Sequence, residues 1–289
     1  MDIRAILMGL AFAFMWSSAF TSARIIVADA PPLSALAIRF MISGLLAVGI
    51  ASVLGQTWRL SRAQWRATFI FGLCQNALYL GLNFVAMQWV EASLAAIIAS
   101  TMPLAVALAG WAFLGQKTGR LGLAGLLAGI VGVTMIMGTR VSGGADSLGI
   151  VLCFIGVAAL STATLMVRGA TSGGNVLMIV GLQMLAGSAI LAPFAVALET
   201  WQVNWNWTLI AAFAYTTLVP GLVATWVWFL LVNRIGAVKA ATFHFLNPFF
   251  GVAIAASILG EAVGLLDLAG VVIIALGILA VQIARQPAT

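Results

Sequence analysis

The chain has 289 residues, of which 63% are hydrophobic and only 7% are charged. Soluble domains carry about 25% charged residues, so this composition excludes a water-soluble protein and indicates that lipid surrounds most of the chain. The formal net charge is +6, but the 13 basic residues are spread thinly between apolar runs and form no basic face that would bind nucleic acid. We therefore expect the lipid bilayer as surroundings and no nucleic-acid partner.

Ten apolar segments follow one another, each close to the roughly 20 residues that a helix needs to cross the hydrocarbon core. In chain order they are Ala5–Ala28, Leu33–Leu54, Ala67–Val90, Ser93–Leu114, Leu121–Thr139, Leu148–Val167, Val176–Leu198, Leu209–Val232, Ala237–Leu259 and Val263–Ile283. The first exceeds the roughly 7–15 apolar residues of a signal peptide, and none alternates like a β-barrel strand. The sequence therefore predicts an all-α, multi-pass protein of the cell inner membrane with ten transmembrane helices.

The charges between the spans predict the orientation, because basic residues favour cytoplasmic loops. With both termini in the cytoplasm, that side holds Arg4, Arg59, Arg62, Arg66, Lys117, Arg120, Arg168, Arg234, Lys239 and Arg285. The opposite side then holds only Arg24 and Arg140, together with most of the acidic residues, namely Asp29, Glu91, Asp146, Glu199, Glu261 and Asp267. This asymmetry supports ten spans with cytoplasmic N- and C-termini.

The sequence offers little for metal or covalent chemistry. Cys74 and Cys153 each lie within an apolar run, which is typical of small buried residues rather than of a disulfide or a metal pair. The chain has one histidine and no CxxC or HExxH pattern. We expect no metal, no cofactor and no catalytic residue.

Arg39, in the second span, is the one charge well inside an apolar segment, roughly 9 Å from its outer end. Its side chain either snorkels outward or pairs with a backbone carbonyl or a substrate carboxylate. In the seventh span, Gln183 falls close to the position that Arg39 holds in the second. We take both as candidate substrate-binding residues.

The third span carries a polar stripe, formed by Gln75, Asn76, Tyr79 and Asn83. Their spacing of i, i+1, i+4 and i+8 places them on one helix face, which must avoid lipid. This face either lines a substrate cavity or joins neighbouring helices by hydrogen bonds. The eighth span shows a similar face, formed by Thr217, Gly221, Thr225 and Trp228, with Pro220 beside it.

Prolines lie near the middle of the fourth and ninth spans, at Pro103 and Pro248. Each removes a backbone hydrogen bond, which is tolerated at that depth where protein or a wet cavity satisfies the freed carbonyl. Thr101 precedes the first, and His244 and Asn247 precede the second. Each proline is either a packing kink or part of a cavity lining. For His244 there are also two interpretations: a buried imidazole with its hydrogen bonds satisfied, or a residue that contacts the substrate or relays protons.

The tryptophans and the glycines of the fifth span also follow a pattern. Six of the ten tryptophans fall near span ends, whereas Trp16, Trp111, Trp226 and Trp228 lie deeper and suit a cavity for flat, amphipathic solutes. In the fifth span, Gly122, Gly125, Gly129 and Gly132 share a face that permits close helix contact, within the bundle or between chains. We expect a monomer or a weak oligomer.

The two halves of the chain resemble each other at an offset of 145 residues. Pro103 then aligns with Pro248, Leu114-Gly115 with Leu259-Gly260, and Gly132 with Gly277. Each half, 1–144 and 145–289, holds five spans, so the second enters the membrane from the opposite face. Inverted repeats of this kind are common in secondary transporters.

Paired five-helix halves with a mid-span proline, a following L-G-[Q/E] and a glycine-rich last helix resemble the drug/metabolite transporter superfamily, in its ten-helix EamA-type exporter branch. Among these the sequence looks most like the bacterial aromatic amino acid exporters. The acidic residue after the L-G pair is present as Glu261 but replaced by Gln116 in the first half, which argues against an indispensable ionic role there. The resemblance implies export of small molecules by alternating access, one half rocking against the other around a central cavity.

Other functions stay open. A multidrug or organic cation carrier of the same superfamily shares these features. An intramembrane enzyme would need an activated nucleophile, a carboxylate pair or a metal, for which the sequence has no motif. A channel would conduct without saturation. No carboxylate lies mid-span, so the coupling is either facilitative or not visible in the sequence.

Overall fold

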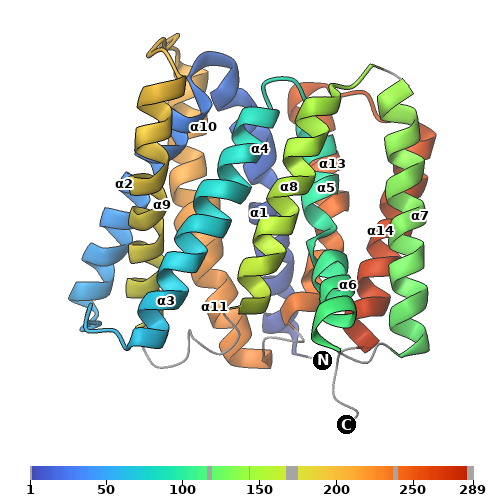
Figure 1. The fold of residues 1–289 in the computed structure, drawn as a ribbon, viewed down its shortest axis with the longest axis horizontal. Helices are drawn as coiled ribbons and strands as arrows, with labels where there is room; N and C mark the ends of the chain where they lie inside the picture. The colour runs from blue at the N-terminus through green and yellow to red at the C-terminus, as the bar shows by residue number, and fades with distance from the viewer. Residues whose placement is uncertain (1, 116–118, 143, 167–174, 237–239, 285–289) are drawn as a thin grey trace. The chain divides into compact units, whose positions relative to one another are not determined.

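A computed structural model describes residues 2–115, 119–142, 144–166, 175–236 and 240–284, which are helical apart from short connections (Figure 1). In the first repeat the helices are α1 (Ile3–Asp29), α2 (Pro32–Val53), α3 (Arg62–Phe71), the π-helix η1 (Gly72–Leu80), α4 (Gly81–Ala86), α5 (Ala92–Ser100), α6 (Met102–Leu114) and α7 (Arg120–Ser142). In the second they are α8 (Ser147–Met166), α9 (Val176–Leu198), α10 (Trp207–Leu218), the π-helix η2 (Val219–Val223), α11 (Ala224–Ile235), the 3₁₀ helix η3 (Thr242–Leu246), α13 (Asn247–Leu259) and α14 (Leu265–Ala284).

The ten expected spans are confirmed, because ten helical stretches of the described chain are long and apolar enough to cross a bilayer. Their limits agree with the expected ones to within a few residues, apart from the third, which begins earlier, at Arg62, and the ninth, which is described from Thr242. Val167 and residue 237, where we expected the sixth span to end and the ninth to begin, lie outside the described residues, as do Gln116, Lys117, Arg168, Lys239 and Arg285.

Several helix boundaries in the described residues recur at the offset of 145 residues. Met102–Leu114 and Asn247–Leu259 correspond at both ends, and each is followed by a glycine in the left-handed region, Gly115 at φ 60° and Gly260 at φ 68°. The offset also relates the starts of α7 and α14 and those of α3 and α10. The sequence identities marked only the last two helices of each half, because apolar residues inside a span interchange freely while its ends do not.

The chain forms two compact units, and each combines helices from both repeats. Unit 1 comprises Met1–Thr21, Trp89–Val151 and Val223–Thr289, and unit 2 comprises Ser22–Gln88 and Leu152–Leu222. The repeats of the sequence are therefore not the compact bodies of the fold.

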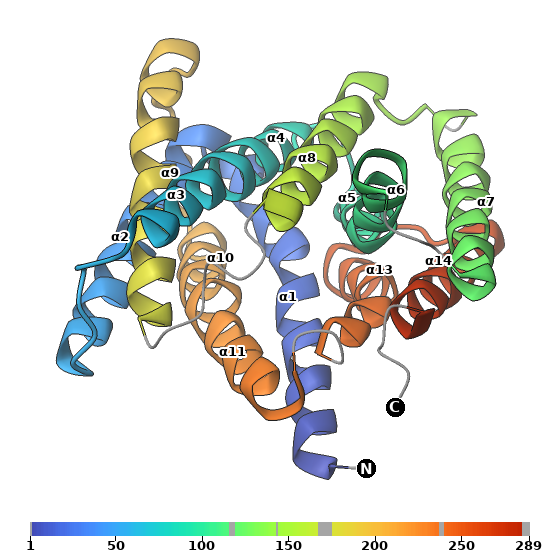
Figure 2. The same ribbon diagram turned by 60° about the horizontal axis from the view of Figure 1, so that its bottom comes forward.

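Within unit 1, α7 and α14 lie side by side and antiparallel (Figure 2). A Cβ placed on Gly277 would lie 2.7 Å from the Gly125 carbonyl oxygen, and one on Gly132 would lie 2.9 Å from the Gly270 carbonyl oxygen. From the first contact to the second, the residue number increases along α7 and decreases along α14, as it does in antiparallel helices. Adding 145 to Gly125 and Gly132 gives Gly270 and Gly277, so the repeat maps each contact onto the other. The two contacts are therefore related by a local twofold axis between inverted repeats.

Within unit 2, α2 and α9 pair in the same antiparallel manner (Figure 2). Gly44 and Gly181 face each other, since a Cβ on either would lie 3.0 Å from the carbonyl oxygen of the other. A side chain that follows each of these two helices caps the start of the other helix. The Glu199 carboxylate, after α9, accepts from the backbone N–H of Leu33 and Ser34 at 2.7 and 2.8 Å, and Gln56, after α2, accepts from that of Met178 at 3.0 Å. These side chains satisfy N–H groups that a helix start leaves unpaired.

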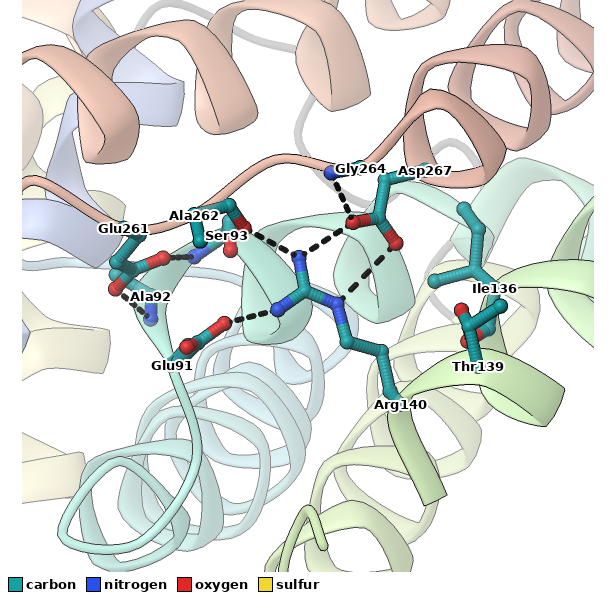
Figure 3. A network of polar contacts seen from close by, with 10 residues as sticks. All are labelled: Glu91, Ala92, Ser93, Ile136, Thr139, Arg140, Glu261, Ala262, Gly264 and Asp267. Carbon is teal, nitrogen blue, oxygen red and sulfur yellow. Dashed lines mark hydrogen bonds and ion pairs between the residues drawn. The ribbon is translucent and has the colours of Figure 1, made fainter. Parts of the chain in front are cut away.

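One end of unit 1 holds a network of charged residues (Figure 3). The Arg140 guanidinium lies between the carboxylates of Glu91 and Asp267, with 3.0 Å to the latter, and it ties the end of α7 to the starts of α5 and α14. The Glu261 carboxylate accepts from the backbone N–H of Ala92 and Ser93 at 2.7 and 2.9 Å. Glu261 thus caps α5.

Candidate functional site

An aromatic cluster in unit 1 brings together three of the predicted site residues. The Phe12 ring lies at the centre, with its centroid 5.7 Å from Trp16, 4.7 Å from Trp228 and 5.4 Å from His244. Trp228 and His244 are themselves 5.3 Å apart. Phe12 is buried, whereas the two tryptophans and the histidine are half-buried.

The helix break before Pro248 positions the polar part of this cluster. Residues 242–246 form the 3₁₀ helix η3, none of whose side chains is fully buried, and α13 begins at Asn247 with Pro248 in its first turn. A proline is favourable there because it has no N–H to leave unpaired. The Ser17 hydroxyl, on α1, donates to the Asn247 carbonyl at 3.2 Å. The break therefore fixes His244 and Asn247 against α1.

His244 and Asn247 are joined side chain to side chain. The imidazole Nδ1 lies 2.9 Å from the amide nitrogen of Asn247, so the amide donates to Nδ1 and Nε2 carries the imidazole proton. The Asn247 side-chain oxygen is buried and has no hydrogen-bond partner among the described residues. A buried acceptor without a donor is costly, and it is an available partner for a donor group on a bound solute.

The corresponding break in span four is different in kind. The Thr101 hydroxyl donates to the Ile98 carbonyl at 2.6 Å, and the Ser100 hydroxyl donates to the Ala96 carbonyl at 2.6 Å. Every residue of α5 is buried, and so are Thr101 and Pro103. The hydroxyl of the predicted site residue Thr101 is therefore hydrogen-bonded within its own span.

Arg39 lies in unit 2 with its side chain inward. Only 6% of it is exposed, and its Nε donates to the carbonyl oxygen of Thr216 in α10 at 3.3 Å. Pro220 has no N–H and so cannot donate to that carbonyl, which lies four residues earlier. One turn along α2, the Ser43 hydroxyl donates to the Thr217 carbonyl at 3.3 Å. The predicted Pro220 break thus supplies the acceptor that holds Arg39.

The span-three stripe makes contacts to neighbouring helices of unit 2. Asn76 donates from its side-chain nitrogen to the carbonyl of Gln183 at 2.8 Å, and Gly187 packs directly on it. Tyr79 and Asn83 are buried against Gly156 of α8. Gln75 and Gln183 are half-buried. Asn76 therefore joins two helices, whereas the Asn83 amide donates to the Tyr79 carbonyl of its own span and its side-chain oxygen has no partner in the described part of the chain.

Sequence reasoning overlooked two residues of these clusters. Phe12 lies one turn before Trp16 on the same face of α1, and Ser43 lies one turn after Arg39 on α2. The i, i+4 spacing to a residue already singled out was the available signal. Two of the deeper tryptophans, Trp111 and Trp226, are instead exposed at 54% and 58%.

An exposed ion pair lies outside the spans, where Arg234 contacts Asp2 through its guanidinium. The hydrogen bond from Arg234 lowers the pKa of the Asp2 carboxyl from its ordinary value. Solvent screens this contact, so it serves as a minor link between the start of α1 and the end of α11. Among the described residues no group of histidine, cysteine and carboxylate side chains has the geometry to hold a metal ion.

These features define a class: a ten-helix membrane protein of inverted repeats, with polar and aromatic clusters buried between its spans. The sequence profile of the EamA-like transporter family matches the chain twice, over residues 3–138 and 147–282. The chain belongs to this family, and it is therefore a multi-pass membrane transporter of the drug/metabolite transporter superfamily.

Similar proteins agree with this membership. The transporter YvbV of Bacillus subtilis is 25% identical over 90% of this chain and 85% of its own length. PagO of Salmonella typhimurium is 24% identical over 94% of this chain and 90% of its own, and PecM of Dickeya dadantii is 23% identical over 91% and 86%. A solved crystal structure of 20% identity superposes with a TM-score of 0.67 over 99% of this chain and 100% of its own, which supports the fold. None of these names states a substrate.

Proposed function

We propose that the protein exports amino acids, aromatic ones preferentially, and related small amphipathic metabolites across the cell inner membrane. The observation that carries this is the cluster of Phe12, Trp16, Trp228 and His244, next to the Asn247 side-chain oxygen, which has no partner among the described residues. Aromatic rings stack favourably on aromatic solutes, adding about 0.5–1.5 kcal/mol per pair beyond area burial. The amide oxygen suits an ammonium donor of the same solute.

The transport cycle is alternating access. The glycine contacts bear on which bodies move, since α7 and α14 belong to different repeats and touch backbone to backbone. The two repeats cannot rock against each other as rigid bodies without breaking that contact, so we assign the motion to bodies that combine helices of both. Spin labels on the exposed residues Leu127 and Leu276 should keep one mutual distance with and without tryptophan. A change in that distance on adding tryptophan would contradict this assignment.

The experiment that tests the function uses the purified full chain in proteoliposomes with labelled tryptophan. We expect saturable uptake that unlabelled phenylalanine and tyrosine compete, and counterflow from preloaded vesicles. Flux without saturation would indicate a channel. Saturable flux of organic cations with no flux of amino acids would replace this proposal by the multidrug alternative.

Two tryptophans of α11 supply a matched pair of variants. Trp228 belongs to the cluster, whereas Trp226, two residues earlier, is 58% exposed. We expect Trp228→Leu to raise the KM for tryptophan about tenfold, the equivalent of roughly 1.4 kcal/mol, and Trp226→Leu to leave it unchanged. Equal effects of both variants would count against the cluster as a binding site.

A further inference from the structure

Arg39 is a buried cation to which the described part of the chain offers no anion. Its side chain is 6% exposed, and the three ion pairs among the described residues join Arg140 to Glu91, Arg140 to Asp267 and Arg234 to Asp2. An arginine stays charged in proteins, so burial does not remove its charge. A charge at this depth in a membrane protein is costly and by default marks a functional site.

The guanidinium is held along one edge and has donors left over. Its five N–H groups form a rigid fork, and among the described residues only its Nε is hydrogen-bonded, to the Thr216 carbonyl. The Phe40 ring lies beside it, with 5.3 Å from the guanidinium carbon to the ring centroid. Gly221 lies against the other end, since a Cβ there would be 3.6 Å from Nη2. Backbone and ring thus orient the fork without neutralising it.

We propose that Arg39 is, within unit 2, a binding site for the carboxylate of a transported solute, and that it makes the protein select carboxylates over amines. The terminal nitrogens Nη1 and Nη2 present two parallel donors, which match the two oxygens of a carboxylate. A single guanidinium balances one negative charge, so a monoanion fits better than a phosphate dianion. This inference rests on the proposed function and names the chemical class that it accepts, and it disfavours organic cations.

The test compares two tryptophan analogues that each lack one head group. Indole-3-propionate keeps the carboxylate without the ammonium, and tryptamine keeps the ammonium without the carboxylate. We expect indole-3-propionate to inhibit labelled tryptophan uptake by the wild type about tenfold or more better than tryptamine does, as a charge-assisted bidentate contact supports. Inorganic phosphate should not compete. Equal inhibition by the two analogues, or strong inhibition by phosphate, would overturn the proposal.

The variants Arg39→Gln and Ser43→Ala separate charge from structure. The glutamine side chain keeps a donor for the Thr216 carbonyl but loses the charge, and the ratio of the two inhibition constants should fall to about one. Ser43→Ala removes the neighbouring hydrogen bond to Thr217 without changing charge, and the ratio should stay at its wild-type value. Because both constants are measured on one preparation, a merely structural role of Arg39 leaves their ratio unchanged. An unchanged ratio in Arg39→Gln would contradict the proposal.

A binding readout keeps this inference separate from the proposed function. If the wild type shows no saturable tryptophan flux, the proposed function fails, and thermal unfolding with each analogue still tests Arg39. A larger rise in melting temperature with indole-3-propionate than with tryptamine would support the carboxylate site, and equal rises would refute it. Should Arg39→Gln fail to fold, Arg39→Lys keeps the charge without the fork and should give an intermediate ratio.

Discussion

Spans four and nine contain the same helix break and use it for different purposes. Both interrupt at a proline in the first turn of a 13-residue helix, and both of these helices end at a left-handed glycine. In span four the residues before the break are buried and return their hydroxyls to their own carbonyls. In span nine the residues before the break form a 3₁₀ helix without a fully buried side chain, and His244 faces an aromatic cluster.

The comparison distinguishes the feature that both repeats retain, the backbone break, from the feature in which they differ, the side chains beside it. A backbone break is a requirement of the fold, because helix boundaries position every later span. The side chains beside the break are free to diverge once the carbonyls have partners. Paired prolines therefore locate a paired architecture, and we expect the site at the copy beside the aromatic cluster.

The largest effect should follow from forcing spans four and nine apart. They meet where Gly251 of α13 packs on Ala96 of α5, and a Cβ on Gly251 would lie 2.5 Å from that of Ala96. Gly251→Val should lower stability by about 1–3 kcal/mol or more, because the backbone must shift to admit the side chain. Size-exclusion profiles and thermal unfolding in detergent measure the loss. Gly49→Val is the control, since no described atom beyond its own helix backbone lies within 4 Å of a Cβ placed there. A normal profile for Gly251→Val would disprove the contact.

A smaller but more specific effect should follow from changing the site copy of the break. His244→Leu removes both the contact to Asn247 and the edge-on packing with Phe12, so we expect tryptophan kcat/KM to fall about tenfold while the melting temperature changes little. His244→Phe keeps the ring and should retain more activity than His244→Leu. Normal transport by His244→Leu would make the histidine a core residue and remove the contrast between the two spans.

The cap at the far end of span nine gives a third comparison, through stability alone. Glu261→Ala leaves the Ala92 and Ser93 N–H groups of α5 without their acceptor, which should cost about 0.5–2 kcal/mol and lower the melting temperature by a few degrees. Glu261→Gln reproduces the residue of the first repeat, keeps one acceptor and should cost less. Equal losses in both variants would show that the charge itself is required.

The sequence predicted the spans and the repeat well because both depend on local composition: twenty apolar residues make a span wherever they occur, and Gly115 and Gly260 mark helix ends by their own backbone preference. The partners of the site residues could not be predicted in this way. Arg39 is held by a carbonyl that Pro220 frees in another helix, and Phe12 is one aromatic residue among many in an apolar segment. Gly72, the first residue of the π-helix η1, packs against Ala186 and Gly187 of α9, which are distant in the sequence.

The smallest effect should come from the buried copy of the break, and it tests whether polarity near a proline is enough to define a site. Ser100→Ala and Thr101→Val each remove a hydroxyl that bonds only to a carbonyl of its own helix in the described structure, so no contact between helices is lost. We expect tryptophan KM and kcat to stay within about twofold of wild type, because such bonds contribute only about 0.5–1.5 kcal/mol and serve the local backbone. Transport assays on the double variant beside His244→Leu provide the comparison. A tenfold loss of transport in the double variant with an unchanged melting temperature would place span four in the site after all, and the two breaks would then act as a functional pair.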